Sequence, residues 1–300
     1  MSPIVKEANA PDALETLPML STSPENHPPV PQPVWYFAYG SNMASSTFMG
    51  MRKIKPLSHH RAIVPTHKLT FDIPGIPYKE PSFASIDEKG EGGMACIGVV
   101  YEITREDYER VLATEGAGSS YAEIEVEAYK LVGNEEKAPA DIVKDEKNFV
   151  KAMTLKAIRI RKPNPRPSVR YLNILRDGAA EHKLPEAYAS WLASLPAYHP
   201  PTRPLRAVVG KYIFLTVWMP VVMVIFTLLR TTTGKSGKAP GWLRWLAERT
   251  FRTMWRWHDS HFWRTVFGRG DGLEEKQFDD EKNSQLLYKP LIQLAISPQC

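Results

Sequence analysis

A short run of aromatic and β-branched residues, Val34 to Tyr39, stops abruptly at Gly40-Ser41-Asn42. A run of this kind, bounded by turn residues, is typical of a buried β-strand that enters a tight loop. Glycine permits unusual backbone angles and asparagine tolerates the left-handed region, so the loop can turn its N–H groups outward toward a carboxylate or a developing oxyanion. An ordinary turn remains the alternative for these three residues.

Patterns of strands and helices continue as far as residue 199. Further strands are expected over residues 62–73, 95–103, 121–132 and 151–160, with a charged loop at 134–148. Thr104 begins a capping pattern for a short helix, Ser168 one for a helix that ends near Gly178, and Pro185 suits the first turn of another helix. Strands therefore precede a helix pair, which favours an α+β fold over residues 34–199, with a closed or curled β-barrel-like sheet flanked by helices.

An acidic residue, Glu115, lies between the short helix and the strand that begins at Tyr121. A carboxyl group beside glycine in an otherwise apolar stretch is suited to accept and return protons. Considered alone, the same residue is also explained as a solvated glutamate at a helix end.

The segment from Tyr36 to Met43 resembles the signature of the γ-glutamylcyclotransferase family. Other segments resemble the family in the same order: Gly98 to Ile103, Glu115-Gly116 with Tyr121 and Ile124 to Val126, Pro167 to Tyr171, and Gly178 to Tyr188. Five ordered matches over residues 34–199 are more specific than either motif alone. The resemblance implies a small, closed, β-barrel-like fold whose cavity holds a γ-glutamyl group.

The resemblance also implies a reaction, in which the substrate's α-amine attacks its own γ-carbonyl and releases 5-oxoproline. It implies that Glu115 transfers the protons, and that Tyr121 and the loop residues bind the substrate: Tyr39, Gly40, Ser41 and Asn42. Neither a metal ion nor an organic cofactor is required. Fungal relatives in epipolythiodioxopiperazine (gliotoxin-type) pathways share this pattern, which makes a glutathione-derived conjugate one candidate substrate. γ-Glutamyl amino acids and glutathione are the others.

Two positions depart from the family pattern. Leu155 stands where many relatives have a tyrosine, and Ser41-Asn42 replaces the Ser-Leu that is typical of the glutathione-specific branch. Leu155 supports a rival hypothesis, a catalytically inactive, membrane-tethered binding protein with the same fold.

Other motifs and the cysteines do not indicate a second function. Gly234-Lys235-Ser236 lacks the earlier glycine of a phosphate-binding loop, because position 229 is leucine. The cysteines, Cys96 and Cys300, are too few for a disulfide framework or a structural zinc site, and Cys96 is expected to be a buried small hydrophobe.

The two ends of the chain are expected to be disordered. Residues 1–33 contain eight of the 26 prolines and little apolar periodicity, and residues 271–300 are also mostly polar. Residues 1–33 lack the pattern of a secretory signal, so the catalytic domain is expected in the cytosol.

Positive charge is concentrated in one segment. Residues 201–270 contain twelve Lys or Arg and two acids, a net charge of +10, so the remainder carries −5 of the total +5. The basic character therefore belongs to this segment, and nothing indicates nucleic acid as a partner.

The basic segment contains two candidate membrane elements. Tyr212 to Leu229 has no charged residue, so residues 205–230 reach membrane-spanning length, with Pro220 as a kink. Residues 240–268 read as a basic, Trp-rich amphipathic helix suited to a headgroup interface. We therefore expect membrane association through residues 205–268, either dipping into the bilayer or lying flat. Helices that pack on protein are the alternative for both elements.

Overall fold

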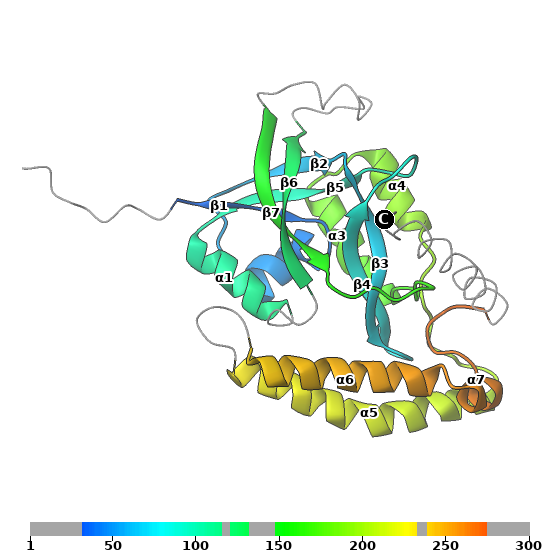
Figure 1. Cartoon of the computed structure of the whole chain (residues 1–300). Coiled ribbons are helices and arrows are strands. Elements are labelled where there is room, and N and C mark those ends of the chain that lie inside the picture. Colours follow the sequence, from blue (N-terminus) through cyan, green and yellow to red (C-terminus); the bar gives the residue numbers. More distant parts are fainter. Residues whose placement is uncertain (1–31, 116–120, 132–147, 233–238, 275–300) are drawn as a thin grey trace, which may run out of the picture. The chain divides into compact units, whose positions relative to one another are not determined.

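The computed structural model describes residues 32–115, 121–131, 148–232 and 239–274. The predicted disorder of residues 1–31 and 275–300 and most of the predicted charged loop lie outside the described residues. The predicted α+β class is confirmed, because strands form a closed barrel and helices flank it (Figure 1).

Five strands close the barrel in the order β1-β5-β2-β6-β7. Their bounds are Val34–Ala38 (β1), Ser58–Val64 (β2), Cys96–Ile103 (β5), Tyr121–Lys130 (β6) and Phe149–Ala157 (β7). Neighbouring strands are antiparallel, except that β7 runs parallel to β1 and closes the barrel where Tyr36 faces Met153.

The prediction of a single strand over residues 62–73 is wrong. The chain turns at Pro65-Thr66, so β2 ends and a separate strand, β3 (His67–Ile76), begins. Proline has no N–H group and cannot continue the hydrogen-bond ladder of a central strand. β3 pairs outside the barrel with β4 (Glu80–Glu88), a strand that the sequence analysis did not predict.

The helices of the barrel domain begin at the predicted caps. α1 (Arg105–Thr114) is capped by Thr104, whose hydroxyl accepts from the Asp107 N–H at 3.1 Å. α3 (Val169–Glu181) is capped by Ser168, and α4 (Glu186–Ser194) follows Pro185.

Gly178 does not end α3 as predicted, because the helix continues to Glu181. A Cβ at Gly178 would lie 2.7 Å from both the Ala44 nitrogen and the Met43 Cβ. Gly178 therefore allows the helix to approach the chain just after the Gly40-Ser41-Asn42 loop.

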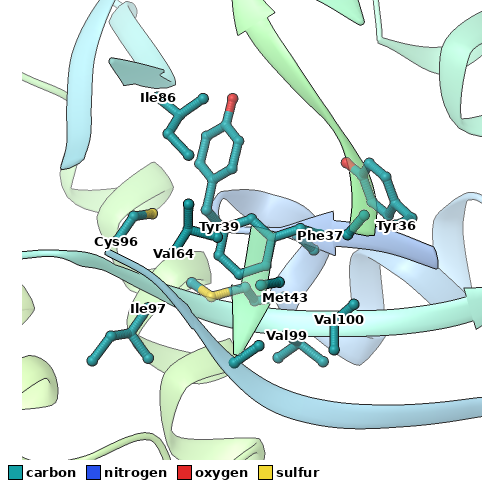
Figure 2. Close-up of a cluster of buried hydrophobic side chains, with 14 of the residues drawn as sticks. Tyr36, Phe37, Tyr39, Met43, Val64, Ile86, Cys96, Ile97, Val99 and Val100 are labelled. Atoms are coloured by element: carbon teal, nitrogen blue, oxygen red, sulfur yellow. The ribbon is translucent and has the colours of Figure 1, made fainter. Parts of the chain in front are cut away.

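The barrel interior and its flanking helices share one hydrophobic cluster. Figure 2 shows part of this cluster, with side chains from several strands: Tyr36 and Phe37 of β1, Val64 of β2, Ile86 of β4, and Cys96, Ile97, Val99 and Val100 of β5. Burial raises the pKa of the Cys96 thiol to about 12, so it remains a protonated, apolar filler of the core.

The basic segment forms three helices, α5 (Leu205–Thr232), α6 (Gly241–His258) and α7 (His261–Phe267). The prediction of one amphipathic helix over residues 240–268 is therefore wrong, because α6 stops before Ser260, whose hydroxyl caps α7. α5 contains Pro220 and, within the described residues, is the one helix long and apolar enough to cross a membrane.

These helices pack on the end of β3. Ile76 and Tyr78 lie in one buried cluster with Phe214, Trp255 and Trp263. The indole N–H of Trp255 donates to the Gly75 carbonyl at 2.9 Å, and that of Trp263 donates to the Tyr78 hydroxyl at 2.9 Å. One face of α5 and much of α6 are therefore covered by protein.

The contact at Gly178 can be tested by Gly178→Ala. In an ordinary helix this change stabilises the fold by up to about 1 kcal/mol. Here the added methyl group would push on the backbone at Met43 and Ala44, and we expect a loss of about 1–3 kcal/mol in chemical denaturation. Asp177→Ala, at the exposed neighbouring position, should change little. A stabilised Gly178→Ala protein would contradict this packing.

Candidate active site

Glu115 lies at the end of α1, and one of its two carboxylate oxygens is held by two donors. Oε1 accepts from Nδ2 of Asn42 at 2.9 Å and from Nη2 of Arg52 at 2.6 Å. The Arg52 and Glu115 side chains are 10% and 17% exposed, so this ion pair is largely shielded from water. Among the described residues, no hydrogen bond is made to Oε2.

Asn42 connects this carboxylate to the barrel. Its Oδ1 accepts from Nε of Arg52 at 2.6 Å, and its Nδ2 also donates to the Tyr36 hydroxyl at 2.9 Å. Asn42, Arg52 and Glu115 are therefore bonded pairwise in a closed triangle, which we call the carboxylate clamp. Three mutual contacts fix the rotamer of each side chain.

The loop conformation differs from the prediction. Neither Gly40 nor Asn42 has a positive φ, so the expectation of left-handed residues is wrong. Residues Ser41–Met43 instead form a 3₁₀ turn, in which the Met43 N–H donates to the Gly40 carbonyl at 3.0 Å. As in any helical turn, the first N–H groups, those of Ser41 and Asn42, have no acceptor within it.

Gly40 has little free space around it. A Cβ there would lie 3.3 Å from the Ala84 Cβ, which is tighter than most contacts, and 3.4 Å from the Tyr171 hydroxyl. The loop thus lies directly against β4 and α3.

Tyrosines surround the clamp and remain protonated. Burial, and then the negative charge of Glu115, raises the pKa of Tyr36 and Tyr121 well above the usual value. Burial likewise raises the pKa of Tyr171, with Glu115 contributing. At neutral pH these phenols are neutral hydrogen-bonding groups. The Tyr171 hydroxyl accepts from the Ala84 N–H at 3.1 Å.

A cavity of about 860 Å³ opens beside Glu115. From the barrel domain its lining includes Ser41, Thr47, Arg52, Phe83, Glu115, Tyr121 and Tyr171. Of the predicted site residues, Ser41, Glu115 and Tyr121 line the cavity, and Asn42 contacts Glu115. Within the described residues, Tyr39 and Gly40 are not part of the lining.

The hydroxyl of Tyr39 donates to the backbone carbonyl of Leu155, and both residues are buried. The departure from the family pattern at Leu155 therefore lies next to the loop. The side chain of Leu155 does not take part in this bond, because the acceptor is its main-chain oxygen.

Sequence reasoning missed Arg52. It lies ten residues after Asn42, just beyond the short π-helix at Ser46–Met51. Nothing in the pattern distinguishes it from the neighbouring Lys53 and Lys55, because its role depends on the fold of the turn.

One group of side chains has the composition of a metal site within the described residues: His258, Asp259 and Asp271. Their polar atoms are already used. Nε2 of His258 accepts from the Gly270 N–H at 2.9 Å, Nδ1 lies 3.0 Å from Asp259, and Asp271 binds Arg269. Burial favours a raised pKa for Asp259, but the hydrogen bond from His258 and the Arg161 guanidinium lower it. The arrangement fits an ion-pair network at the C-terminal end of α6.

A largely shielded carboxylate that lines a cavity, with one oxygen to which the described residues make no hydrogen bond, is suited to proton transfer to a small ligand. Two family models match the chain: the AIG2-like family over residues 95–192, and the AclK C-terminal domain over residues 204–264. The second match covers most of α5–α7.

Two curated relatives match over most of the chain, and a third over about half of it. The chain is 37% identical to "Gamma-glutamyl cyclotransferase gliK" of Aspergillus fumigatus, over 80% of this chain and 89% of that protein. It is 35% identical to "Gamma-glutamyl cyclotransferase aclK" of Aspergillus oryzae, over 80% of this chain and 90% of that protein. "Gamma-glutamyl cyclotransferase verK" of Clonostachys rogersoniana is 40% identical over 47% of this chain and 82% of that protein.

A solved structure titled "Gamma-glutamyl cyclotransferase" is 21% identical, with a TM-score of 0.45, over 61% of this chain and 98% of that one. Because the chain is more than 30% identical to these curated relatives over most of their length, it belongs to the γ-glutamyl cyclotransferase family.

The clamp predicts a strong coupling between Arg52 and Glu115. Arg52→Met leaves the shielded Glu115 carboxylate without its cation and should destabilise the fold. In the Glu115→Gln background that carboxylate is absent, so the same change at Arg52 should cost less. In a double-mutant cycle measured by chemical denaturation, we expect a coupling free energy of about 1–3 kcal/mol. Independent effects, with a coupling below about 0.5 kcal/mol, would show that the ion pair does not organise the site.

Proposed function

We propose that the protein releases 5-oxoproline from a γ-glutamyl amine, with Glu115 as the proton-transfer group. The substrate's α-amine loses a proton to Glu115, and its nitrogen attacks the γ-carbonyl carbon. The new C–N bond closes the five-membered ring, and the γ-carbonyl oxygen gains negative charge. Glu115 passes its proton to the departing nitrogen, so the old C–N bond breaks as the C=O bond reforms. The attacking nitrogen then gives up its second proton through Glu115 to the departed amine, which leaves as an ammonium ion, and the lactam keeps one N–H. Because the attack is intramolecular, holding one substrate conformer supplies much of the rate.

The observation that carries this proposal is the asymmetric environment of the Glu115 carboxylate. Arg52 and Asn42 hold Oε1 and so fix the carboxylate, no hydrogen bond to Oε2 is made by the described residues, and Glu115 lines the cavity. A general base must be within hydrogen-bond reach of the proton that it accepts, and fixing the carboxylate in advance meets that condition.

The Gly40-Ser41-Asn42 loop supplies hydrogen-bond donors for the γ-carbonyl oxygen of the substrate, which gains negative charge during the attack. The N–H groups of Ser41 and Asn42 are free of acceptors within their turn, and Ser41 lines the cavity with Glu115. Backbone donors aimed at a developing oxyanion are an effective source of transition-state stabilisation. The neutral hydroxyls of Tyr121 and Tyr171 complete a polar pocket for the glutamyl group.

The substrate belongs to one of three groups: γ-glutamyl amino acids, glutathione, or a glutathione-derived conjugate. Similarity to gliK and verK supports a role in fungal mycotoxin biosynthesis and therefore the conjugate. The inactive binding protein is disfavoured, because the clamp is intact and Tyr39 bonds to the main chain at Leu155.

Glu115→Gln keeps the size of the side chain and removes its capacity to accept a proton. We expect 5-oxoproline release from γ-glutamyl dipeptides, glutathione and glutathione conjugates to fall at least about 100-fold. Glu125→Gln, an exposed carboxylate of β6, is the matched control and should retain activity. A folded Glu115→Gln protein with a rate near that of the wild type would show that another group transfers the proton.

We also propose that the protein associates with membranes through the outward face of α5, with the catalytic domain in the cytosol. Several large apolar side chains remain exposed along this face: Leu205, Val209, Ile213, Val217, Val221 and Val224. The opposite face packs on α6 and α7, which favours a helix that lies on the bilayer over one that spans it. An apolar stripe of this length is unusual on a protein surface exposed to water.

Sedimentation with phosphatidylcholine vesicles tests this attachment. The full chain should pellet with vesicles in 1 M salt and be released by detergent, because apolar contact is not screened. Val217→Glu/Val224→Glu should remain in the supernatant with its activity unchanged, whereas the charge-matched Ala180→Glu/Ala193→Glu should pellet. Release by salt alone would contradict apolar attachment and indicate binding through surface charge.

A further inference from the structure

The cavity beside Glu115 extends well beyond the space for a glutamyl group. At about 860 Å³, it lies near the upper end of the range for drug-sized ligands, roughly 300–1,000 Å³. Its far wall is formed by α6 and the end of α5, through Phe226, Leu229, Phe251, Arg252, Trp255 and Arg256. The helices after the barrel domain therefore face the same space as Glu115.

Part of this space is apolar and not filled by protein. Met51, Ile160 and Phe226 line the cavity, yet their exposed fractions are 78%, 54% and 47%. Phe226 and Phe251 form an edge-on aromatic pair, with ring centroids 6.1 Å apart, between α5 and α6. Exposed apolar and aromatic side chains inside a concave site are typical of surfaces that bind an apolar ligand group.

The same space carries excess positive charge. Eight Lys or Arg side chains and four carboxylates line it. Glu248 is shared between Arg159 and Arg252, and Arg256 makes no ion pair within the described part of the chain. A cleft lined mainly by one sign of charge attracts a ligand of the opposite sign. Arg252 and Arg256 lie one turn apart on α6 and suit a carboxylate.

Contacts to the barrel domain fix this wall in place. Arg161 binds both carboxylate oxygens of Asp259 at 2.9 and 2.8 Å, and its guanidinium lies 4.0 Å from the centroid of the Trp255 ring. Arg159 pairs with Glu248, and the Trp255 indole bonds to Gly75. Arg252 and Arg256 of α6 are thus held at the cavity, where they are preorganised for binding.

We propose that α6 forms the leaving-amine subsite, in which Arg252 and Arg256 bind a carboxylate and Phe251 with Phe226 contacts a bulky apolar substituent. This inference rests on the proposed function and names the class of substrate: a γ-glutamyl amide whose leaving amine carries both a carboxylate and a large apolar group. Arg252, Arg256 and Phe251 then determine specificity, while Glu115 and the loop act on the glutamyl end.

Three probes separate these contributions: S-benzylglutathione carries both groups, glutathione carries only the carboxylate, and γ-glutamylmethylamide carries neither. For Arg252→Gln/Arg256→Gln in the full chain, we expect kcat/KM to fall at least tenfold on the first two, mainly through KM, and to be unchanged on the third. Phe251→Ser should affect S-benzylglutathione more than glutathione. Arg249→Gln, an exposed arginine of α6 outside the cavity, is the matched control.

Calorimetric binding in the Glu115→Gln background provides a second measurement that needs no turnover. S-Benzylglutathione should bind at least tenfold more tightly than γ-glutamylmethylamide, and the arginine double variant should reduce that preference, leaving the part that the benzyl group contributes. An equal loss on all three probes, or no preference in binding, overturns the subsite. If the wild type binds with this preference but releases no 5-oxoproline from any probe, the proposed function fails and the subsite stands.

Discussion

The hydrogen-bonded triangle of Asn42, Arg52 and Glu115 is the interaction on which the account of this site depends. A carboxylate that is largely shielded from water needs a cation or good donors, and here it has both on one oxygen. The constraint has a structural consequence, because it fixes the orientation of a carboxylate that lines the cavity. It also joins three separate segments of the chain: the loop after β1, the turn after the π-helix, and the end of α1.

Close packing behind the loop supports this triangle. Gly178 lets α3 lie against Met43 and Ala44, Gly40 lets the loop lie against Ala84, and Tyr39 bonds to the main chain at Leu155. On the opposite side of the cavity, Arg161 and Trp255 hold α6 to the barrel domain. One side of the cavity thus fixes the Glu115 carboxylate, and the other carries apolar and basic groups.

Local patterns predicted most strands of the barrel and the caps at Thr104 and Ser168, since each depends on neighbouring residues, but they missed the break at Pro65-Thr66 that ends β2. The resemblance singled out Glu115 and the loop, and the fold brings Glu115 and Asn42 into contact. Features set by distant contacts were not predicted. The role of Arg52 requires the turn that brings it back to Asn42. Gly178 is needed because its helix packs against Met43 and Ala44, more than 130 residues earlier in the chain. Periodicity predicted an amphipathic helix in the region of α6, but it cannot say whether its basic side chains meet lipid or protein. In the fold, Arg252 and Arg256 face the cavity.

The most direct test of the central claim is a crystal structure with bound 5-oxoproline, the product that the proposed reaction forms. We expect the lactam nitrogen within hydrogen-bond distance of Glu115 Oε2, about 2.7–3.2 Å. We also expect the lactam oxygen at the N–H groups of Ser41 and Asn42, with Oε1 still bound by Arg52 and Asn42. Product bound with its nitrogen away from Oε2, or a Glu115 side chain that leaves Arg52, would contradict the account.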